Sequence, residues 1–222
     1  MNSKKLAADK AVSFVRDGMV VGLGTGSTAY WAIEGIGERM LKEGLKLKAI
    51  ATSTQSEKQA RALGIPIVSF AEIDEIDLTI DGADEADPGK NLIKGGGGAL
   101  LREKIVASNS KILIIVVDQS KLVKTLGKFP LPVEATIFGW EKTYKKLQGL
   151  GCVPGLRHVQ AKPFVTDNGN YIIDCQFDQI PDPADLQQRI NAITGVVDNG
   201  LFVGLTSKII AGLEDGNTRI ID

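Results

Sequence analysis

Five short apolar stretches of this chain have the length and composition of β-strands, and each ends in a cluster of small polar or charged residues. The clusters occupy residues 24–28, 52–54, 81–84, 94–98 and 118–121. In an open parallel α/β sheet, ligands bind in the crevice beyond the carboxyl ends of the strands. We therefore expect the five clusters to converge on one pocket, and their residue types indicate an enzyme that acts on a small anionic molecule.

The composition sets limits on partners and location. With 26 basic and 27 acidic residues, the chain has no overall field that favours nucleic acid or an anionic membrane, so an anion must be held locally. Residues 1–16 have the pattern of an amphipathic helix without the apolar stretch of a signal peptide, and no segment approaches the roughly 20 apolar residues of a membrane span. Two cysteines, Cys152 and Cys175, give no disulfide framework. We expect a cytoplasmic protein with reduced, structural thiols.

The shortage of histidine limits the possible chemistry. The single histidine, His158, lies far along the chain from all five clusters, so a His-based triad or a multi-His zinc site cannot be assembled. Acid/base chemistry must therefore use carboxylates and lysines. We interpret His158 as an ordinary strand residue.

The order of predicted elements divides the chain into two parts. Up to residue 129, strands alternate with helices at about 27–43, 55–63 and 99–109, as in a doubly wound parallel sheet. After a break at residues 129–132 come strand 133–136, helix 140–150, strands 156–160 and 171–177, helix 184–193 and strand 201–203. This order is that of a split βαβ, ferredoxin-like unit. We predict an α/β fold with a Rossmann-like domain at 1–129, rejoined by 207–222, and a smaller ferredoxin-like α+β domain at 130–206.

The segment 22–28 (GLGTGST) follows a predicted strand and opens a predicted helix, where free backbone N–H groups and hydroxyls favour phosphate. A dinucleotide site is disfavoured, because Ser27 occupies the third glycine position of the fingerprint and no acidic residue ends the next strand. A P-loop is excluded as well, since neither Gly-Lys pair, 89–90 or 127–128, precedes Ser or Thr. The alternative to a phosphate site at residues 22–28 is a tight turn with a purely structural role.

Two further clusters carry charge. Residues 81–85 (DGADE) place carboxylates beyond an apolar strand, which suits acid/base chemistry or Mg²⁺ binding, or equally a turn with caps. Lys94 precedes four glycines. Glycines cost conformational entropy on folding and contribute no side-chain packing, but they allow the backbone to approach a ligand closely. Glu103 follows in the predicted helix 99–109, where its position alone also fits a solvated residue. Lys121 fits either a phosphate contact or an exposed surface residue.

Six segments together resemble the type A ribose-5-phosphate isomerases. They are residues 22–28 (GLGTGST), 81–85 (DGADE), 94–104 (KGGGGALLREK), 118–123 (DQSKLV), 127–134 (GKFPLPVE) and 165–170 (VTDNGN). Each segment alone is weak evidence, but six with family-like order and spacing, covering essentially the whole chain, are strong. A fourth glycine, Gly98, is a minor departure.

The resemblance implies an aldose–ketose isomerase, without cofactor or metal, that interconverts D-ribose 5-phosphate and D-ribulose 5-phosphate through an enediolate in the non-oxidative pentose phosphate pathway. Carried over to this sequence, it makes Glu103 the general base between C1 and C2. It assigns ring opening and the developing oxyanion to Asp81, Asp84 and Lys94. The implied substrate-binding residues are Thr25, Gly26, Ser27, Thr28, Asp81, Gly82, Ala83, Asp84, Lys94, Gly95, Gly96, Gly97 and Lys121. The family also implies a homo-oligomer, a dimer or a tetramer.

The chemistry agrees with this assignment. Removing a proton next to a carbonyl requires a carboxylate over the carbon and a positive or N–H-rich partner for the enolate oxygen. Glu103, with Lys94 and the glycine amides, supplies that pair without histidine.

Two other functions compete with the isomerase. The first is another enzyme of similar fold. An amino-sugar-phosphate deaminase would be expected to use a histidine in its site, and a CoA transferase with a glutamate nucleophile would need room for CoA. A sugar-phosphate sensor fused to a DNA-binding domain would need a helix-turn-helix, and only about 20 residues precede the first predicted strand. Ligand binding stabilises sensor and enzyme alike, so only a turnover assay separates them.

Overall fold

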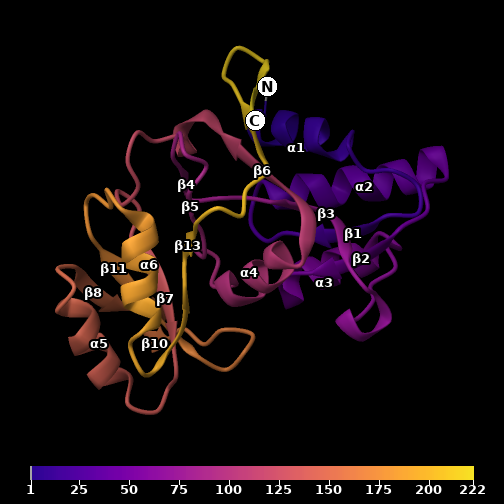
Figure 1. Ribbon diagram of the computed structural model, residues 1–222. Helices are drawn as coiled ribbons and strands as arrows, with labels where there is room; N and C mark the ends of the chain where they lie inside the picture. The colour runs from indigo at the N-terminus through magenta and orange to yellow at the C-terminus, as the bar shows by residue number, and fades with distance from the viewer. Residues whose placement is uncertain (1) are drawn as a thin grey trace. The chain divides into compact units, whose positions relative to one another are not determined.

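The computed structural model describes residues 2–222, whose contacts form two compact units (Figure 1). The first unit comprises the chain up to Ala83 together with Arg102–Leu122 and Leu205–Asp222, and the second comprises Asp84–Leu101 and Val123–Gly204. None of the helices in residues 2–222 is long and apolar enough to cross a membrane. The domain boundaries expected from the sequence, 1–129 with 207–222 and 130–206, stay a prediction. The contact grouping differs from them by placing residues 84–101 and 123–129 in the second unit and residues 205–206 in the first.

The first unit is built on a six-stranded sheet with the order β15-β14-β6-β3-β1-β2. The strands are β1 Val20–Leu23, β2 Lys48–Ala51, β3 Ile76–Asp81, β6 Ser110–Asp118, β14 Lys208–Gly212 and β15 Thr218–Ile221. All neighbouring pairs are parallel except β14 and β15, which form an antiparallel edge. This sheet is the predicted Rossmann-like, mostly parallel α/β architecture, and the last two strands extend it.

Helices cover the sheet because its strands are apolar along most of their length. They are α1 Ser3–Val12, α2 Ala29–Glu43, α3 Thr54–Ala62 and α4 Leu100–Ser108, with short 3₁₀ turns at η1 Phe70–Glu72 and η2 Gln119–Lys121. Helices α1 and α2 lie side by side in Figure 1, and α1 also packs on β6 and β14. Burial of apolar surface on both faces explains why these strands consist of almost continuous hydrophobic runs.

The second unit contains an antiparallel sheet with the order β12-β7-β11-β8. Along the chain its elements are β7 Leu131–Ala135, α5 Trp140–Gln148, β8 Val153–Leu156, β11 Tyr171–Gln176, α6 Pro183–Asn191 and β12 Val196–Asn199. The fourth strand lies beside the first and the third separates the first from the second, which is the ferredoxin-like arrangement expected from the sequence. His158 is an exposed residue of β9 His158–Val159, which pairs with β10 Lys162–Pro163. Cys152 and Cys175 are free and buried in the core of this unit.

Two strand predictions were wrong. Leu92–Ile93 (β5) is no part of the parallel sheet, and Leu201–Phe202 (β13) is not the last strand of the ferredoxin-like sheet. These two-residue strands pair with each other, and β5 also pairs with β4 Glu85–Ala86, in a separate three-stranded sheet. The fourth ferredoxin-like strand is β12, and the chain leaves it at Gly200, whose N–H donates to Pro132 O (2.7 Å). The cluster at 94–98 therefore does not follow a strand of the parallel sheet.

Candidate active site

A turn at residues 24–28, here called the phosphate turn, lies where the order of the parallel sheet reverses. From β1 the chain passes to β2 on one side and then to β3 on the other, so the carboxyl ends of β1 and β3 flank the switch point. At this point the Thr25 N–H donates to Asp81 Oδ1 (3.0 Å), at the end of β3. Ligands of open α/β sheets bind at such switch points.

Local geometry explains the glycines of the phosphate turn. A Cβ on Gly24 would collide with the Asp81 carboxylate, and Gly26 has a φ of +107°, a conformation that disfavours side chains. Helix α2 then begins at Ala29, and the buried side chain of Thr28 makes no capping hydrogen bond to it. The turn thus presents a helix N-terminus, with backbone N–H groups and a hydroxyl, to an anion.

A cluster of hydroxyl groups holds Thr25. Its Oγ1 lies 2.7 Å from Thr52 Oγ1, 2.9 Å from Ser53 Oγ and 3.1 Å from Ser56 Oγ. Ser56 Oγ also donates to Gly24 O (2.6 Å). The cluster at 52–54 was predicted from the sequence and Ser56 was not. Ser56 lies three residues after Ser53, the N-cap of α3, and its N–H donates to the Ser53 hydroxyl.

Lys4 is a second residue that the sequence did not reveal. Its Nζ donates to Ser27 Oγ (2.8 Å), which brings a positive charge from α1 to the phosphate turn. Only the packing of α1 beside α2 creates this proximity, so no local motif indicates it.

Asp81 is 1% exposed and is fixed by backbone donors. Besides the Thr25 N–H, the Gly82 N–H donates to its Oδ1 (2.7 Å). Charge-assisted hydrogen bonds of this kind hold a carboxylate in one orientation. Gly82 and Ala83 follow it as half-buried residues.

Glu103 is 4% exposed, so the alternative of a solvated helix residue is wrong. It lies one helical turn before Val106, which is buried against Ile50 and Ile76. Just beyond the other end of α4, Asn109 O accepts from the N–H of Ile76, the first residue of β3 (3.1 Å). Helix α4 therefore runs antiparallel to β3, and Glu103 lies toward the end of the sheet where β3 finishes.

Lys121 lies in η2, directly after β6, and is half-buried. Because β6 pairs in parallel with β3, Lys121 follows the strand next to the one that ends at Asp81. The first unit therefore brings the phosphate turn, residues 81–83, Glu103 and Lys121 to one edge of its sheet.

The second unit contains the other predicted residues. The Gly96 N–H donates to Asp84 Oδ2 (2.8 Å), and a Cβ on Gly96 would lie 2.6 Å from Asp84 Oδ1. Lys94 is 2% exposed, and its Nζ lies 5.4 Å from the centre of the Phe202 ring. Residues 95–98, here called the glycine loop, form a turn in which the Gly98 N–H donates to Gly95 O (2.9 Å). Asp84 thus approaches the loop backbone as closely as a glycine allows.

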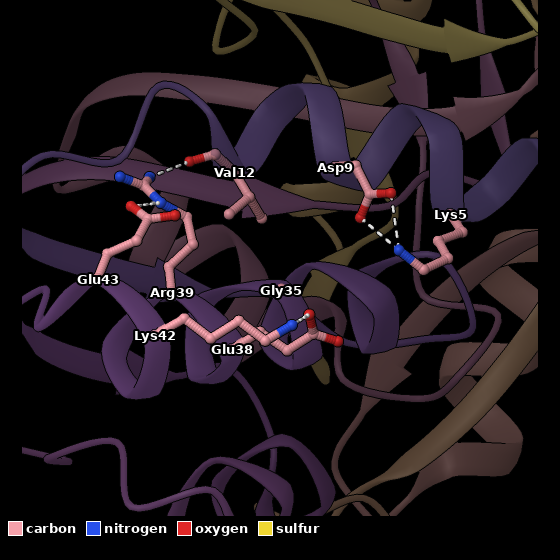
Figure 2. Close-up of a pocket in the computed structure, with 8 residues that line it drawn as sticks. All are labelled: Lys5, Asp9, Val12, Gly35, Glu38, Arg39, Lys42 and Glu43. Carbon is pink, nitrogen blue, oxygen red and sulfur yellow. Dashed lines mark hydrogen bonds and ion pairs between the residues drawn. The ribbon is translucent and has the colours of Figure 1, made fainter.

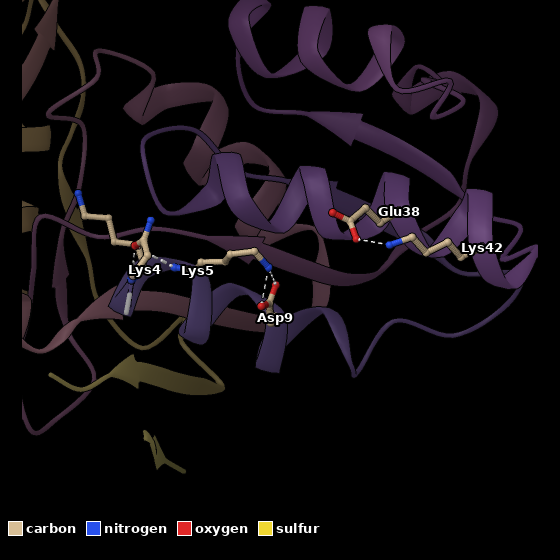
Figure 3. A network of polar contacts seen from close by, with 6 residues as sticks. Lys4, Lys5, Asp9, Glu38 and Lys42 are labelled. Atoms are coloured by element: carbon tan, nitrogen blue, oxygen red, sulfur yellow. Dashed lines mark hydrogen bonds and ion pairs between the residues drawn. The ribbon is translucent and has the colours of Figure 1, made fainter. Parts of the chain in front are cut away.

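A groove between α1 and α2 is lined by described residues that include none of the hydroxyl side chains of the predicted site (Figure 2). Its six charged side chains form three ion pairs, each within one helix: Lys5–Asp9, Arg39–Glu43 and Lys42–Glu38. Figure 3 shows Lys5 directed to Asp9 along α1 and Lys42 to Glu38 along α2. The three basic and three acidic side chains sum to zero, so the groove has no net positive charge to attract an anionic substrate.

Comparison with known proteins decides what chemistry this arrangement serves. Residues 48–216 match the family model of ribose 5-phosphate isomerase A (phosphoriboisomerase A). The chain belongs to this isomerase family. A ribose-5-phosphate isomerase A of Bacillus mycoides (strain KBAB4) is 55% identical over 217 residues, which are 97% of this chain and 98% of the relative.

Solved structures of the isomerase family agree. The enzyme from Methanocaldococcus jannaschii has a TM-score of 0.94 and 40% identity, covering 99% of this chain and 97% of its own. A D-ribose-5-phosphate isomerase in complex with phospho-erythronic acid has a TM-score of 0.96 and 38% identity, covering 100% of both chains. The protein is therefore an isomerase of the pentose phosphate pathway that interconverts ribose 5-phosphate and ribulose 5-phosphate. This result confirms the function inferred from the six sequence segments, in place of a deaminase, a transferase or a sensor.

Proposed function

We propose that the isomerisation proceeds through an enediolate, with Glu103 as the base that moves the proton between C1 and C2. The observation that carries the proposal is the burial of Glu103 at the end of α4 that lies toward Asp81 and the carboxyl end of β3. A buried carboxylate is costly unless it is paired or hydrogen-bonded, so a glutamate is rarely buried without a specific role, and a carboxylate is the type of base that this reaction needs.

The steps balance with this chain's own groups. Opening the furanose removes a proton from the C1 hydroxyl and adds one to the ring oxygen, which we assign to Asp81, Asp84 and Lys94. Glu103 then removes the C2 proton, and the electron pair moves onto the C1 oxygen. A proton passes from O2 to O1, and Glu103 returns its proton to C1, leaving a ketone at C2. Lys94 and the Gly97 N–H of the glycine loop stabilise the oxyanion, since the Gly96 N–H is bonded to Asp84 and the Gly98 N–H to Gly95 O.

The phosphate group is assigned to the phosphate turn. We propose that the N–H groups and hydroxyls of residues 25–28 and the Lys121 ammonium bind its oxygens, and that Lys4, held beside Ser27, adds charge. The related structure in complex with phospho-erythronic acid supports the proposal, because that ligand carries a phosphate group as ribose 5-phosphate does.

Thr28→Val and Lys121→Ala are expected to weaken substrate binding, each by roughly 1.5 to 3 kcal/mol, because each removes a hydrogen bond to a charged group. Binding of ribose 5-phosphate and of unphosphorylated ribose should be measured for each variant and the parent. The preference for the phosphorylated sugar should fall. An unchanged ratio of the two affinities in both variants would place the phosphate elsewhere.

Turnover is expected to survive exhaustive chelation, because Lys94 and backbone N–H groups supply the positive partner that a metal would otherwise give. The rate should be measured after dialysis against EDTA and after addition of Mg²⁺. Loss of activity that Mg²⁺ restores would show that the carboxylates of residues 81–85 form a metal site.

We also propose a cytoplasmic location and a homo-oligomer, a dimer or a tetramer. The two free cysteines support the first, because thiols stay reduced in that compartment. The second rests on the family, and sedimentation velocity of the purified protein tests it.

A further inference from the structure

Arg157, which follows β8, connects the glycine loop to the ferredoxin-like sheet. Its Nη1 donates to the carbonyl oxygens of Gly95 and Gly96, each at 3.0 Å. Its Nε donates to Asp174 Oδ2 (2.9 Å), and its Nη2 donates to Asp174 Oδ1. The Arg157 side chain is only 14% exposed. One guanidinium therefore makes four hydrogen bonds in two directions.

Asp174 fixes the direction in which Arg157 points. It belongs to β11, which pairs with β7 on one side and with β8 on the other, so its backbone is held by two ladders. A bidentate pair with a carboxylate sets the plane of the guanidinium, which leaves Nη1 aimed at the loop. A lysine at this position is a point donor and cannot hold both groups at once.

Phe164 supports the same arrangement from the other end of the loop. Its N–H donates to Arg157 O (2.8 Å), and its ring lies 5.9 Å from the guanidinium carbon of Arg157. A Cβ on Gly98 would collide with this ring. Arg157 thus holds the start of the glycine loop, while Phe164 packs against its end.

The bonds to Arg157 set the direction of the loop amides. In a trans peptide the C=O and the N–H point to opposite sides. Since the Gly95 and Gly96 carbonyls both face Arg157, the N–H groups of Gly96 and Gly97 face away from it. The contact between the Gly96 N–H and Asp84 agrees with this orientation.

We propose that Arg157 is a positioning residue for the isomerisation, which holds the Gly96 N–H on Asp84 and the Gly97 N–H on the face of the loop that receives the substrate oxyanion. The inference rests on the proposed role of the glycine loop. Arg157 touches no substrate atom and acts through two peptide groups. Its loss should therefore affect kcat more than KM, because an oxyanion develops only after the substrate has bound.

The test compares Arg157→Ala and Arg157→Lys with the parent, with and without added guanidinium ion. Both variants should lower kcat/KM by roughly 10- to 100-fold, mainly through kcat, since a loosened loop loses preorganised donors. Guanidinium at sub-denaturing concentration should restore several-fold activity to Arg157→Ala only. Because guanidinium weakens folding, an enzyme that is merely destabilised should lose activity instead.

Two further variants complete the design. Arg189→Ala, which breaks an exposed ion pair with Asp185 on α6, is the matched control and should behave like the parent.

Gly96→Ala tests the loop itself. Folded Arg157 variants with near-parental kcat/KM beside an impaired Gly96→Ala would overturn the role of Arg157 alone, whereas a near-parental Gly96→Ala would overturn the proposed role of the loop. An impaired Arg157→Ala that guanidinium does not rescue would show a structural role. If Arg157→Ala does not fold, the kcat of Arg157→Lys decides.

Discussion

Glu103→Gln should lower kcat by roughly 10² to 10⁴ while the protein stays folded, because glutamine cannot accept the C2 proton or return one to C1. The side chain is buried, and glutamine has nearly the same shape, so the packing around α4 should be kept. KM should change little, since the proposed base acts on the reacting carbon and does not anchor the substrate. Steady-state kinetics and a thermal melt of the same preparation measure both effects.

Glu57→Gln is the matched control for this variant. Glu57 is also a glutamate in the first turn of a helix of the first unit, α3, and it pairs with Arg61 on the surface of that helix. The Glu57→Gln variant should have a kcat within about twofold of that of the parent. Near-normal turnover by folded Glu103→Gln would contradict the assignment and make Asp81 or Asp84 the leading candidate for the base.

Lys94→Met should lower kcat by roughly 10² to 10³, the usual loss when one donor to a developing oxyanion is removed. Methionine preserves most of the buried stem that lies near Phe202, so the loss should come from the ammonium group. The measurement is kcat for both directions of the reaction, because the same enediolate is formed from either sugar. Lys162→Met, at an exposed position of β10 in the same unit, is the control. A folded Lys94→Met enzyme with parental kcat would show that the oxyanion is held by other groups.

The phosphate turn and Asp81 could be predicted from the sequence because their geometry is local. A strand that ends in closely spaced glycines and hydroxyls and then opens a helix specifies its own turn, and an aspartate after an apolar strand specifies its own position at the edge of a sheet. Glu103 was ambiguous from its position, because a glutamate in the first turn of a helix is common on surfaces. Its burial follows from the packing of α4 on β1, where Gly22 has no room for a side chain beside Val106.

The residues that the sequence did not reveal depend on tertiary contacts. Lys4 and Arg157 reach the phosphate turn and the glycine loop from elements distant in sequence, and neither belongs to a recognisable motif. The wrong strand assignments have a related cause. Leu92–Ile93 and Leu201–Phe202 are apolar pairs that fit any strand, and only their pairing with each other shows that they form a separate sheet.

The most direct test of the account follows deuterium during turnover in D₂O. The parent enzyme should place solvent deuterium at C1 of ribulose 5-phosphate, and at C2 of recovered ribose 5-phosphate, because a carboxylate that carries the proton between carbons exchanges part of it with water. Folded Glu103→Gln should incorporate hardly any at either carbon. Incorporation by folded Glu103→Gln at the parental rate would contradict Glu103 as the base.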